Sequence, residues 1–364
     1  MKNKQLTPIE WSRGAGKKGS RYISFRNGTT GKEIMDILKT YDACKLDTLK
    51  EKINNKSAET IEKVVRRLEQ GGYVVTDRVW GKKIVRLSKT SKEHFGIEDE
   101  PASELTAGRK LIRRAKESEI KMAFQMSEPL SHIEHKDTFV DSKTIKEKNI
   151  ITLSVKLSRF YGIYSHANKH YIVFNIGGGL DWKVANERNT KEWLRDNYLN
   201  EPLDAAILFV DDMRPIKRML CAETEKNKLS TKNTPYSEMI IYPLEKKGYE
   251  QLQLFRSLPD PETQFLHALF NENEINKHGN ALYDGIWKDD NPEHTPTIIL
   301  FNCDVMRIEK ILSLLRSNSL TSLFIACFDS QEDFYKEIFA DFKCVEVISF
   351  SFDKAKETML QNIY

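Results

Sequence analysis

Residues 56–75, KSAETIEKVVRRLEQGGYVV, join a helical pattern to a helix stop and the start of a strand. Ser57 is a typical N-cap residue, and apolar residues follow at helical spacing, at Ile61, Val64, Val65 and Leu68. Gly71 and Gly72 then end the helix, and YVV begins a β-prone run. The stretch therefore predicts an amphipathic helix that leads directly into a strand.

The segments on either side extend this pattern into a regular order of elements. Thr30-Gly-Lys-Glu33 has the capping-box arrangement and precedes Ile34, Ile37, Leu38 and Tyr41 at helical spacing. A short second helix is predicted over about 46–54, because Leu46, Leu49 and Ile53 share one face. Downstream, YVVTDRV and KKIVRLS flank Trp80-Gly81 and predict a β-hairpin.

Three helices followed by a two-stranded wing is the plan of the winged-helix DNA-binding proteins. Residues 30–95 resemble that superfamily in the order and lengths of their elements, including the LSKTSKEHFG tail after the second wing strand. The resemblance implies contact with double-stranded DNA, although many winged helices bind protein instead. Because such domains commonly act as dimers on paired half-sites, it also implies a homodimer.

The face of the 56–70 helix opposite its apolar stripe is polar and basic. Such a helix packs its stripe inward and presents the other face to the major groove, where basic side chains reach phosphates or guanine edges. Further basic residues and an aromatic crowd the wing. We therefore predict a DNA-binding surface formed by Lys56, Thr60, Lys63, Arg66, Arg67, Arg78, Trp80, Lys82 and Lys83. The alternative is an ordinary charged surface, since Glu59, Glu62 and Glu69 are interspersed with the basic residues and could form ion pairs with them.

The distribution of charge along the chain favours the DNA-binding interpretation. The net charge is +4, but residues 1–92 hold 22 Lys and Arg against 10 Asp and Glu, a balance of +12, and the remainder carries −8. Basicity confined to one predicted domain indicates a polyanionic partner for that domain.

Composition places the chain among globular proteins of more than one domain. It has 364 residues, 40% of them hydrophobic and 30% charged, and its apolar runs, such as AAILFV at 205–210, are too short to span a bilayer. The N-terminus lacks the apolar core of a secretory signal, so we expect a cytoplasmic protein with no membrane partner. The five cysteines are scattered and form no Cys-x-x-Cys pair, and we interpret them as reduced core thiols.

These observations predict four segments and an α/β, multidomain fold. Residues 1–29 are a flexible basic arm that either contacts the DNA backbone or remains a disordered tail. Residues 30–95 are the winged helix and residues 96–150 a helical connector. Residues 151–364 form an α/β domain with a mixed or parallel sheet. This last prediction rests on a hairpin in SRFYGIYSHANKHYIVFNI and on short apolar runs between helical segments: AAILFV, EMIIYPL, TPTIILFN, TSLFIACF and VEVISFSF.

Candidates for chemistry in the C-terminal domain lie after its predicted strands. Carboxylates at strand ends can hold magnesium, but Asp is also a preferred helix cap, and capping is the interpretation we favour for Asp211, Asp212, Asp304, Asp329 and Asp353. The turn NIGGGLDW at 175–182 lacks a phosphate-loop spacing, as does GAGKKGS in the arm. Two pairs of histidines, His132 with His135 and His166 with His170, have no third ligand nearby. We predict no cofactor and no metal site; no catalytic residue is assigned, and whether the protein is an enzyme stays open.

A second resemblance concerns the layout of the whole chain. An N-terminal winged helix, a charged connector and a domain opening with SRFYGIYSHANKHYIVFNIGGGLDW is similar to proteins of plasmids and integrative conjugative elements, including the replication-relaxation family. It implies a role in replication, relaxation or its control at an element's origin, with replication or relaxosome proteins as partners. The alternatives are a winged-helix transcriptional regulator that senses a ligand and a metal-dependent nuclease.

Overall fold

A computed structural model of the protein describes most of the chain. The described residues are 28–53, 55–79, 81–97, 108–130, 137–148, 155, 158, 160–166, 168–176, 184–221, 231, 234–270, 275, 283–287, 295–317 and 322–361. The chain divides into two compact units, residues 1–122 and 123–364. This division falls inside the segment 96–150 that the sequence predicts as a connector. The predicted arm, 1–29, lies almost wholly outside the described residues.

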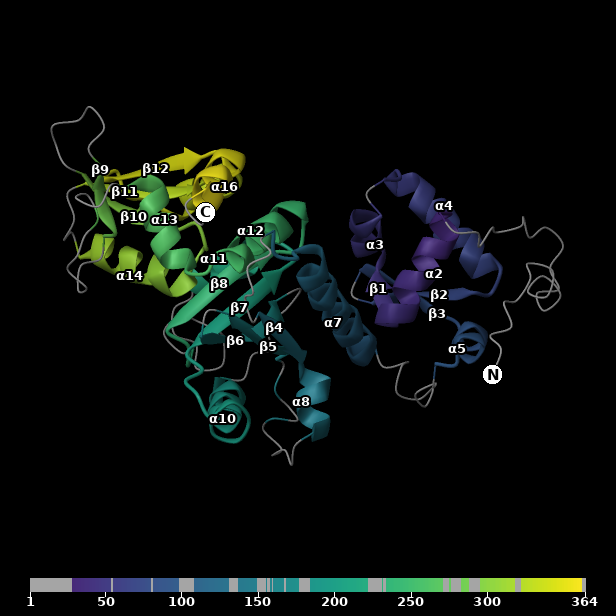
Figure 1. The fold of residues 1–364 in the computed structure, drawn as a ribbon. Helices are drawn as coiled ribbons and strands as arrows, with labels where there is room; N and C mark the ends of the chain where they lie inside the picture. Colours follow the sequence, from purple (N-terminus) through teal and green to yellow (C-terminus); the bar gives the residue numbers. More distant parts are fainter. Residues whose placement is uncertain are drawn as a thin grey trace. The chain divides into compact units, whose positions relative to one another are not determined.

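The helices of the first unit lie where the sequence predicts them (Figure 1). They are α2 (Thr30–Tyr41), α3 (Leu46–Lys52) and α4 (Ala58–Gln70), and their apolar faces share one core in which Ile34, Leu49 and Ile61 are fully buried. The predicted cap of α2 was one residue late. Thr29, not Thr30, is the N-cap, and its hydroxyl accepts a 3.4 Å hydrogen bond from the backbone N–H of Lys32.

The sheet of the first unit has three strands, one more than the sequence predicts. β2 (Val74–Val79) and β3 (Lys82–Leu87) form the expected antiparallel hairpin, with Gly81 in the turn at a φ of +78° that favours glycine. β1 (Ala43–Lys45) pairs antiparallel with β3, so the strand order is β1-β3-β2. Three residues between two helices carry no periodicity of their own, and only pairing with β3 makes them a strand.

Two further helices belong to this unit for all or most of their length. α5 (Lys89–Phe95) is capped by Ser88 and ends at Gly96 in the left-handed conformation. α7 (Gly108–Met126) packs Leu111, Ile112 and Ala115 against Ala43 of β1 and Ile84 of β3. Its Glu119 is buried, accepts a 2.8 Å hydrogen bond from Thr48 and forms a 3.0 Å ion pair with Lys45. Most of α7 is therefore part of the N-terminal core.

The second unit contains two mixed sheets rather than one. The first has the order β4-β5-β6-β7-β8, from β4 (Thr138–Asp141), β5 (Gly162–His166), β6 (Lys169–Ile176), β7 (Ala205–Val210) and β8 (Glu238–Pro243). β4, β5 and β6 pair antiparallel, whereas β6, β7 and β8 are parallel. The hairpin between β5 and β6 lies in the stretch where the sequence predicts one, with Asn168 of its turn at a φ of +60°.

The other sheet has the order β12-β11-β10-β9. Its strands are β9 (Gly285–Trp287), β10 (Thr295–Ile299), β11 (Leu323–Phe328) and β12 (Val345–Phe350), and only the β9–β10 pairing is antiparallel. One apolar core contains fully buried residues of both sheets, including Leu208, Ile298 and Ile325. The mixed α/β class is thus confirmed for this unit.

The remaining helices lie between the strands or, for the last of them, after β12. They are α8 (Ser142–Lys148), α10 (Val184–Leu194), which continues in a π-helical turn (Arg195–Leu199), α11 (Arg214–Cys221), α12 (Lys246–Ser257), α13 (Pro261–Leu269), α14 (Val305–Arg316), a 3-10 turn (Asp329–Gln331), α15 (Glu332–Ile338) and α16 (Phe352–Gln361). The prediction that 96–150 is a helical connector was wrong in part, because the strand β4 lies there. β4 has two apolar residues among four, and its pairing with β5 stabilises it.

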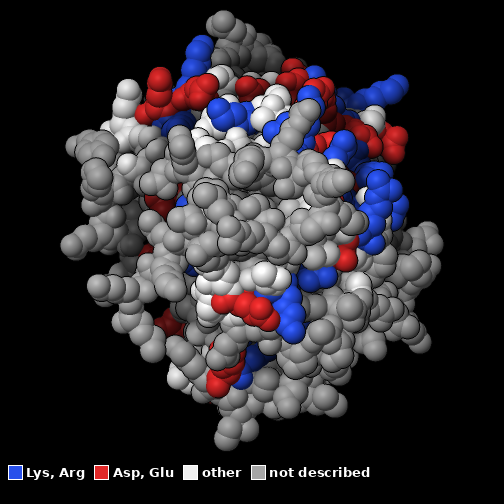
Figure 2. Space-filling view, turned by 90° about the vertical axis from the view of Figure 1, so that its right-hand side faces the viewer, with Lys and Arg blue, Asp and Glu red and all other residues white. Residues whose placement is uncertain are grey.

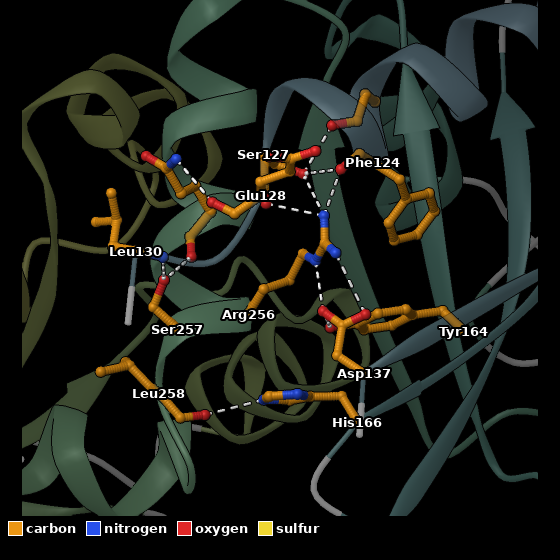
Figure 3. Close-up of polar contacts among 12 residues, drawn as sticks. Phe124, Ser127, Glu128, Leu130, Asp137, Tyr164, His166, Arg256, Ser257 and Leu258 are labelled. Atoms are coloured by element: carbon orange, nitrogen blue, oxygen red, sulfur yellow. Dashed lines mark hydrogen bonds and ion pairs between the residues drawn. The ribbon is translucent and has the colours of Figure 1, made fainter. Parts of the chain in front are cut away.

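A buried ion pair in the second unit binds the C-terminal end of α7 (Figure 3). Arg256 of α12 donates to both carboxylate oxygens of Asp137, at 2.6 and 3.2 Å, and to the backbone carbonyls of Phe124 and Ser127. Tyr164 also donates to Asp137, at 3.1 Å. All three nitrogens of the guanidinium therefore donate either to the last carbonyls of a helix or to a carboxylate, as helix C-termini and Arg forks favour. We call Arg256, Asp137 and Tyr164 the α12 clamp.

Candidate nucleic-acid interface

The helix α4 sets the geometry of the predicted DNA-binding surface. The hydroxyl of Ser57 caps its start by accepting from the backbone N–H of Thr60 at 3.3 Å. Ile61, Val65 and Leu68 are fully buried, and Val64 is packed at the edge of the same core. Because this stripe is fixed inward, the helical geometry forces the opposite face outward.

The basic residues on that face are exposed. Lys56, Thr60, Lys63, Arg66 and Arg67 are all solvent-exposed, and the side chain of Lys63 is 68% accessible. Within the described part of the chain, the only ion pair that these side chains form is the loose one between Lys63 and Glu59, at 4.0 Å. An exposed pair at that distance costs little to separate, so these cations are available to an anionic partner.

Two of the three acidic residues of α4 bind neighbouring elements, whereas Glu59 pairs with Lys63. Glu62 pairs with Lys50 of α3 at 2.6 Å, and the hydrogen bond from Lys50 lowers the pKa of the Glu62 carboxyl. Glu69 accepts a hydrogen bond from the backbone N–H of Thr76 at 3.2 Å and another from its hydroxyl. Two of the three glutamates thus form their hydrogen bonds with neighbouring elements of the same unit.

The hairpin supplies a second group of cations. Arg78 and Lys82 are exposed and Lys83 is half-buried. Arg78 lies opposite Lys83 across the end of the hairpin, whereas Lys82 lies opposite Val79. Trp80, the predicted aromatic contact, lies outside the described residues. Figure 2 shows one face of the molecule, on which basic and acidic side chains are interspersed.

The acidic residues predicted at strand ends lie at or near the starts of helices or helical turns. Asp304 is the N-cap of α14 and accepts from the backbone N–H of Met306 at 3.0 Å and of Met239 at 2.9 Å. Asp329 accepts from the backbone N–H of Ser330, and Asp353 lies in the first turn of α16. Asp212 accepts from the backbone and the guanidinium of Arg214 at the start of α11. The capping interpretation is confirmed for Asp304, whereas Asp329 and Asp353 lie inside the helical segments that they were predicted to cap.

The side chains with metal-ligand chemistry do not converge in the described part of the chain, where no group of three His, Cys, Asp or Glu residues is placed to hold an ion. His166 is buried and hydrogen-bonded to the carbonyl of Leu258 at 2.9 Å, whereas His170 contacts Ser165 and Glu201. His132 and His135 lie outside the described residues, as does most of the glycine-rich turn.

A cavity at the carboxyl ends of the parallel strands is a feature that the sequence does not predict. It has a volume of about 280 Å³ and takes lining residues from the ends of β7 and β8, from the segment after β10, and from the segment after β11. Asp211 and Asp212 line it, but Asp304, Asp329 and Asp353 do not. The other lining residues are Met213, Ile241, Pro243, Glu245, Lys247, Gln251, Cys303, Ser330, Gln331 and Phe334. Strand ends in open α/β sheets are the usual place for ligands.

Comparisons with protein-family models, with curated proteins and with solved structures give no match to this chain. Among the described residues, no helix is both long enough and apolar enough to cross a bilayer.

Proposed function

We propose that residues 30–95 form a winged-helix domain that binds double-stranded DNA, with α4 in the major groove and the β2–β3 hairpin as the wing. The observation that carries this proposal is the outward basic face of α4, whose cations are exposed while two of its three glutamates are bound elsewhere. The order of three helices, a strand between the first two and a C-terminal hairpin supports the same assignment.

The biological setting we propose is a bacterial mobile element. The layout of the chain resembles proteins of plasmids and integrative conjugative elements, so we infer a role in replication, relaxation or its control at the element's origin. Duplex DNA from the region flanking the protein's own gene is accordingly the first substrate to test. A homodimer on paired half-sites would give a footprint with two protected segments about one helical turn apart.

The direct test measures the affinity for that duplex by fluorescence anisotropy over a range of salt concentrations. The variant Lys63→Ala/Arg66→Ala/Arg67→Ala removes three exposed cations from α4 without touching its core, and Ala favours the helix. We expect affinity to fall at least tenfold, and the slope of log affinity against log salt to flatten by about 0.9 for each phosphate that the variant no longer neutralises.

The matched control removes three exposed cations from the second unit, as Arg214→Ala/Lys246→Ala/Lys354→Ala. It should leave both the affinity and the salt slope unchanged, because it alters net charge equally without touching α4. Equal losses in the two triple variants would mean that binding follows net charge alone, and wild-type affinity in the α4 variant would remove α4 from the interface.

A second candidate function, a regulator whose C-terminal unit senses a small molecule, is supported by the cavity at the strand ends. Gln251 of α12 lines that cavity, and Arg256 on the same helix belongs to the clamp that binds the end of α7. Residues 108–122 of α7 belong to the first unit. One helix therefore carries both cavity residues and clamp residues, which is the arrangement a sensor needs if occupancy is to alter α7. The test is whether a compound that binds the cavity changes the affinity for DNA.

A further inference from the structure

The cavity at the strand ends has a preformed wall. Gln251 donates to the hydroxyl of Ser330 at 2.9 Å, and Gln331 donates to the carbonyl of Phe301 at 2.8 Å. Gly248 lets α12 approach the end of β8 so closely that a Cβ atom there would lie 1.9 Å from the carbonyl oxygen of Pro243. These interactions fix the side chains that surround the cavity before any ligand enters, which lowers the cost of binding.

The backbone is strained at one residue that lines this cavity. Cys303, which lines the cavity, has a φ of +49° although it is not glycine. L-residues adopt this conformation only where the surrounding structure enforces it, and such residues gather at ligand sites. Burial raises the pKa of its thiol to about 12, so this residue is a neutral wall group rather than a nucleophile.

The charges around the cavity select the class of ligand. Three carboxylates line it, on Asp211, Asp212 and Glu245, against a single ammonium, on Lys247. Arg214 forms a 2.8 Å ion pair with Asp212, and among the residues that line the cavity carboxylates outnumber ammonium groups. A phosphate or carboxylate ligand would be repelled here, whereas an ammonium group would be attracted.

The apolar part of the lining defines the rest of the ligand. Met213, Ile241 and Phe334 contribute a thioether, an aliphatic chain and an aromatic ring, which together suit a hydrophobic body. An aromatic face and a thioether also accommodate an organic cation. The volume of about 280 Å³ lies just below the usual range for drug-sized ligands, roughly 300–1,000 Å³, so the ligand is compact.

We propose that this cavity binds a small organic amine, with its ammonium group beside Asp211 and Glu245 and its apolar body against Met213 and Phe334. Binding itself does not depend on the DNA-binding proposal. Only its regulatory use rests on that proposed function, and the experiment below contains no DNA, so the two ideas fail separately.

The test uses isothermal titration calorimetry on the full chain with three probes of similar shape: 2-phenylethylamine, 2-phenylethanol and 3-phenylpropionate. At neutral pH they differ in the charge of the head group, positive, neutral and negative. The amine should bind saturably, the alcohol at least threefold more weakly, and the acid not measurably. Equal binding of the three probes, or no binding of the amine, would overturn the proposal.

Variants locate the binding site. Asp211→Asn/Glu245→Gln should weaken amine binding about five- to twentyfold, on the basis of exposed ion pairs. The control Asp353→Asn/Glu357→Gln removes two exposed carboxylates from α16, which do not line the cavity, and should bind like the wild type. Lys247→Gln removes the ammonium group that lines the cavity and should tighten amine binding about two- to fivefold. This variant therefore tests the charge argument even if the double variant folds poorly. A loss of binding in the α16 control as large as in the cavity variant would overturn the assignment.

Discussion

Removing Asp137 from the α12 clamp should destabilise the second unit strongly. The side chains of Asp137 and Arg256 are 7% and 10% accessible, so the pair is nearly removed from water. In Asp137→Ala the guanidinium keeps its carbonyl partners but loses its counter-charge and two of its hydrogen bonds. Breaking a buried ion pair by deleting one partner costs roughly 3–5 kcal/mol, and we expect the free energy of unfolding to fall by that amount.

A double-mutant cycle of Asp137 and Arg256 measures how strongly the two charges of the clamp depend on each other. Arg256→Met leaves the Asp137 carboxylate with only the Tyr164 hydroxyl, so its cost should be similar. Burial raises the pKa of Tyr164, which keeps that hydroxyl protonated as a donor. In Asp137→Ala/Arg256→Met no buried charge lacks a partner, so the combined loss should be smaller than the sum of the two single losses by about 1–3 kcal/mol.

The assay has to resolve the two units, because a chain of two units need not unfold in one step. Hydrogen exchange followed by mass spectrometry across a urea series reports β6 and β7 of the second unit separately from α4 of the first. Glu250→Ala is the control on the same helix, since it breaks the exposed Lys246–Glu250 pair and should cost below about 0.5 kcal/mol. A loss under about 1 kcal/mol in Asp137→Ala would refute the argument that a desolvated charge pair forms the clamp.

Three further outcomes follow from single side chains. Ser57→Ala removes the cap of α4 and should lower the free energy of unfolding of the first unit by about 1 kcal/mol in the same exchange experiment. Burial raises the pKa of Asp304, so its protonated form is favoured by folding. The stability it contributes is complete below pH 3.8, its ordinary pKa, and is lost as pH rises through the raised value. Asp304→Asn should therefore flatten the decline of stability above pH 3.8, and an unchanged pH profile would contradict this. Burial raises the thiol pKa of both Cys303 and Cys327 to about 12, so iodoacetamide at pH 8 should alkylate the half-buried Cys344 before either, as peptide mapping would show.

The first unit was largely predictable because its signals are local. The stripe of Ile61, Val65 and Leu68 has helical spacing, Ser57 is a preferred cap, and glycines end both α4 and the turn of the hairpin. The exposure of Lys63 and Arg66 followed from the same periodicity. The sequence does not predict the strand β1, because it has only three residues. It also does not predict that most of α7 belongs to the first unit, because α7 packs there through contacts such as that of Glu119 with Lys45, which are 74 positions apart.

In the second unit the sequence by itself determined the strands β7, β8, β10, β11 and β12, since each is an apolar run bounded by polar residues. Only the tertiary structure decided that they divide into two sheets, that the ends of β7, β8, β10 and β11 surround one cavity, and that Arg256 meets Asp137 from 119 positions away. The physical reason is that secondary structure follows side-chain periodicity over a few residues. Sheet order and buried charge pairs depend on which distant segments exclude water from one another, and no short stretch of sequence records that.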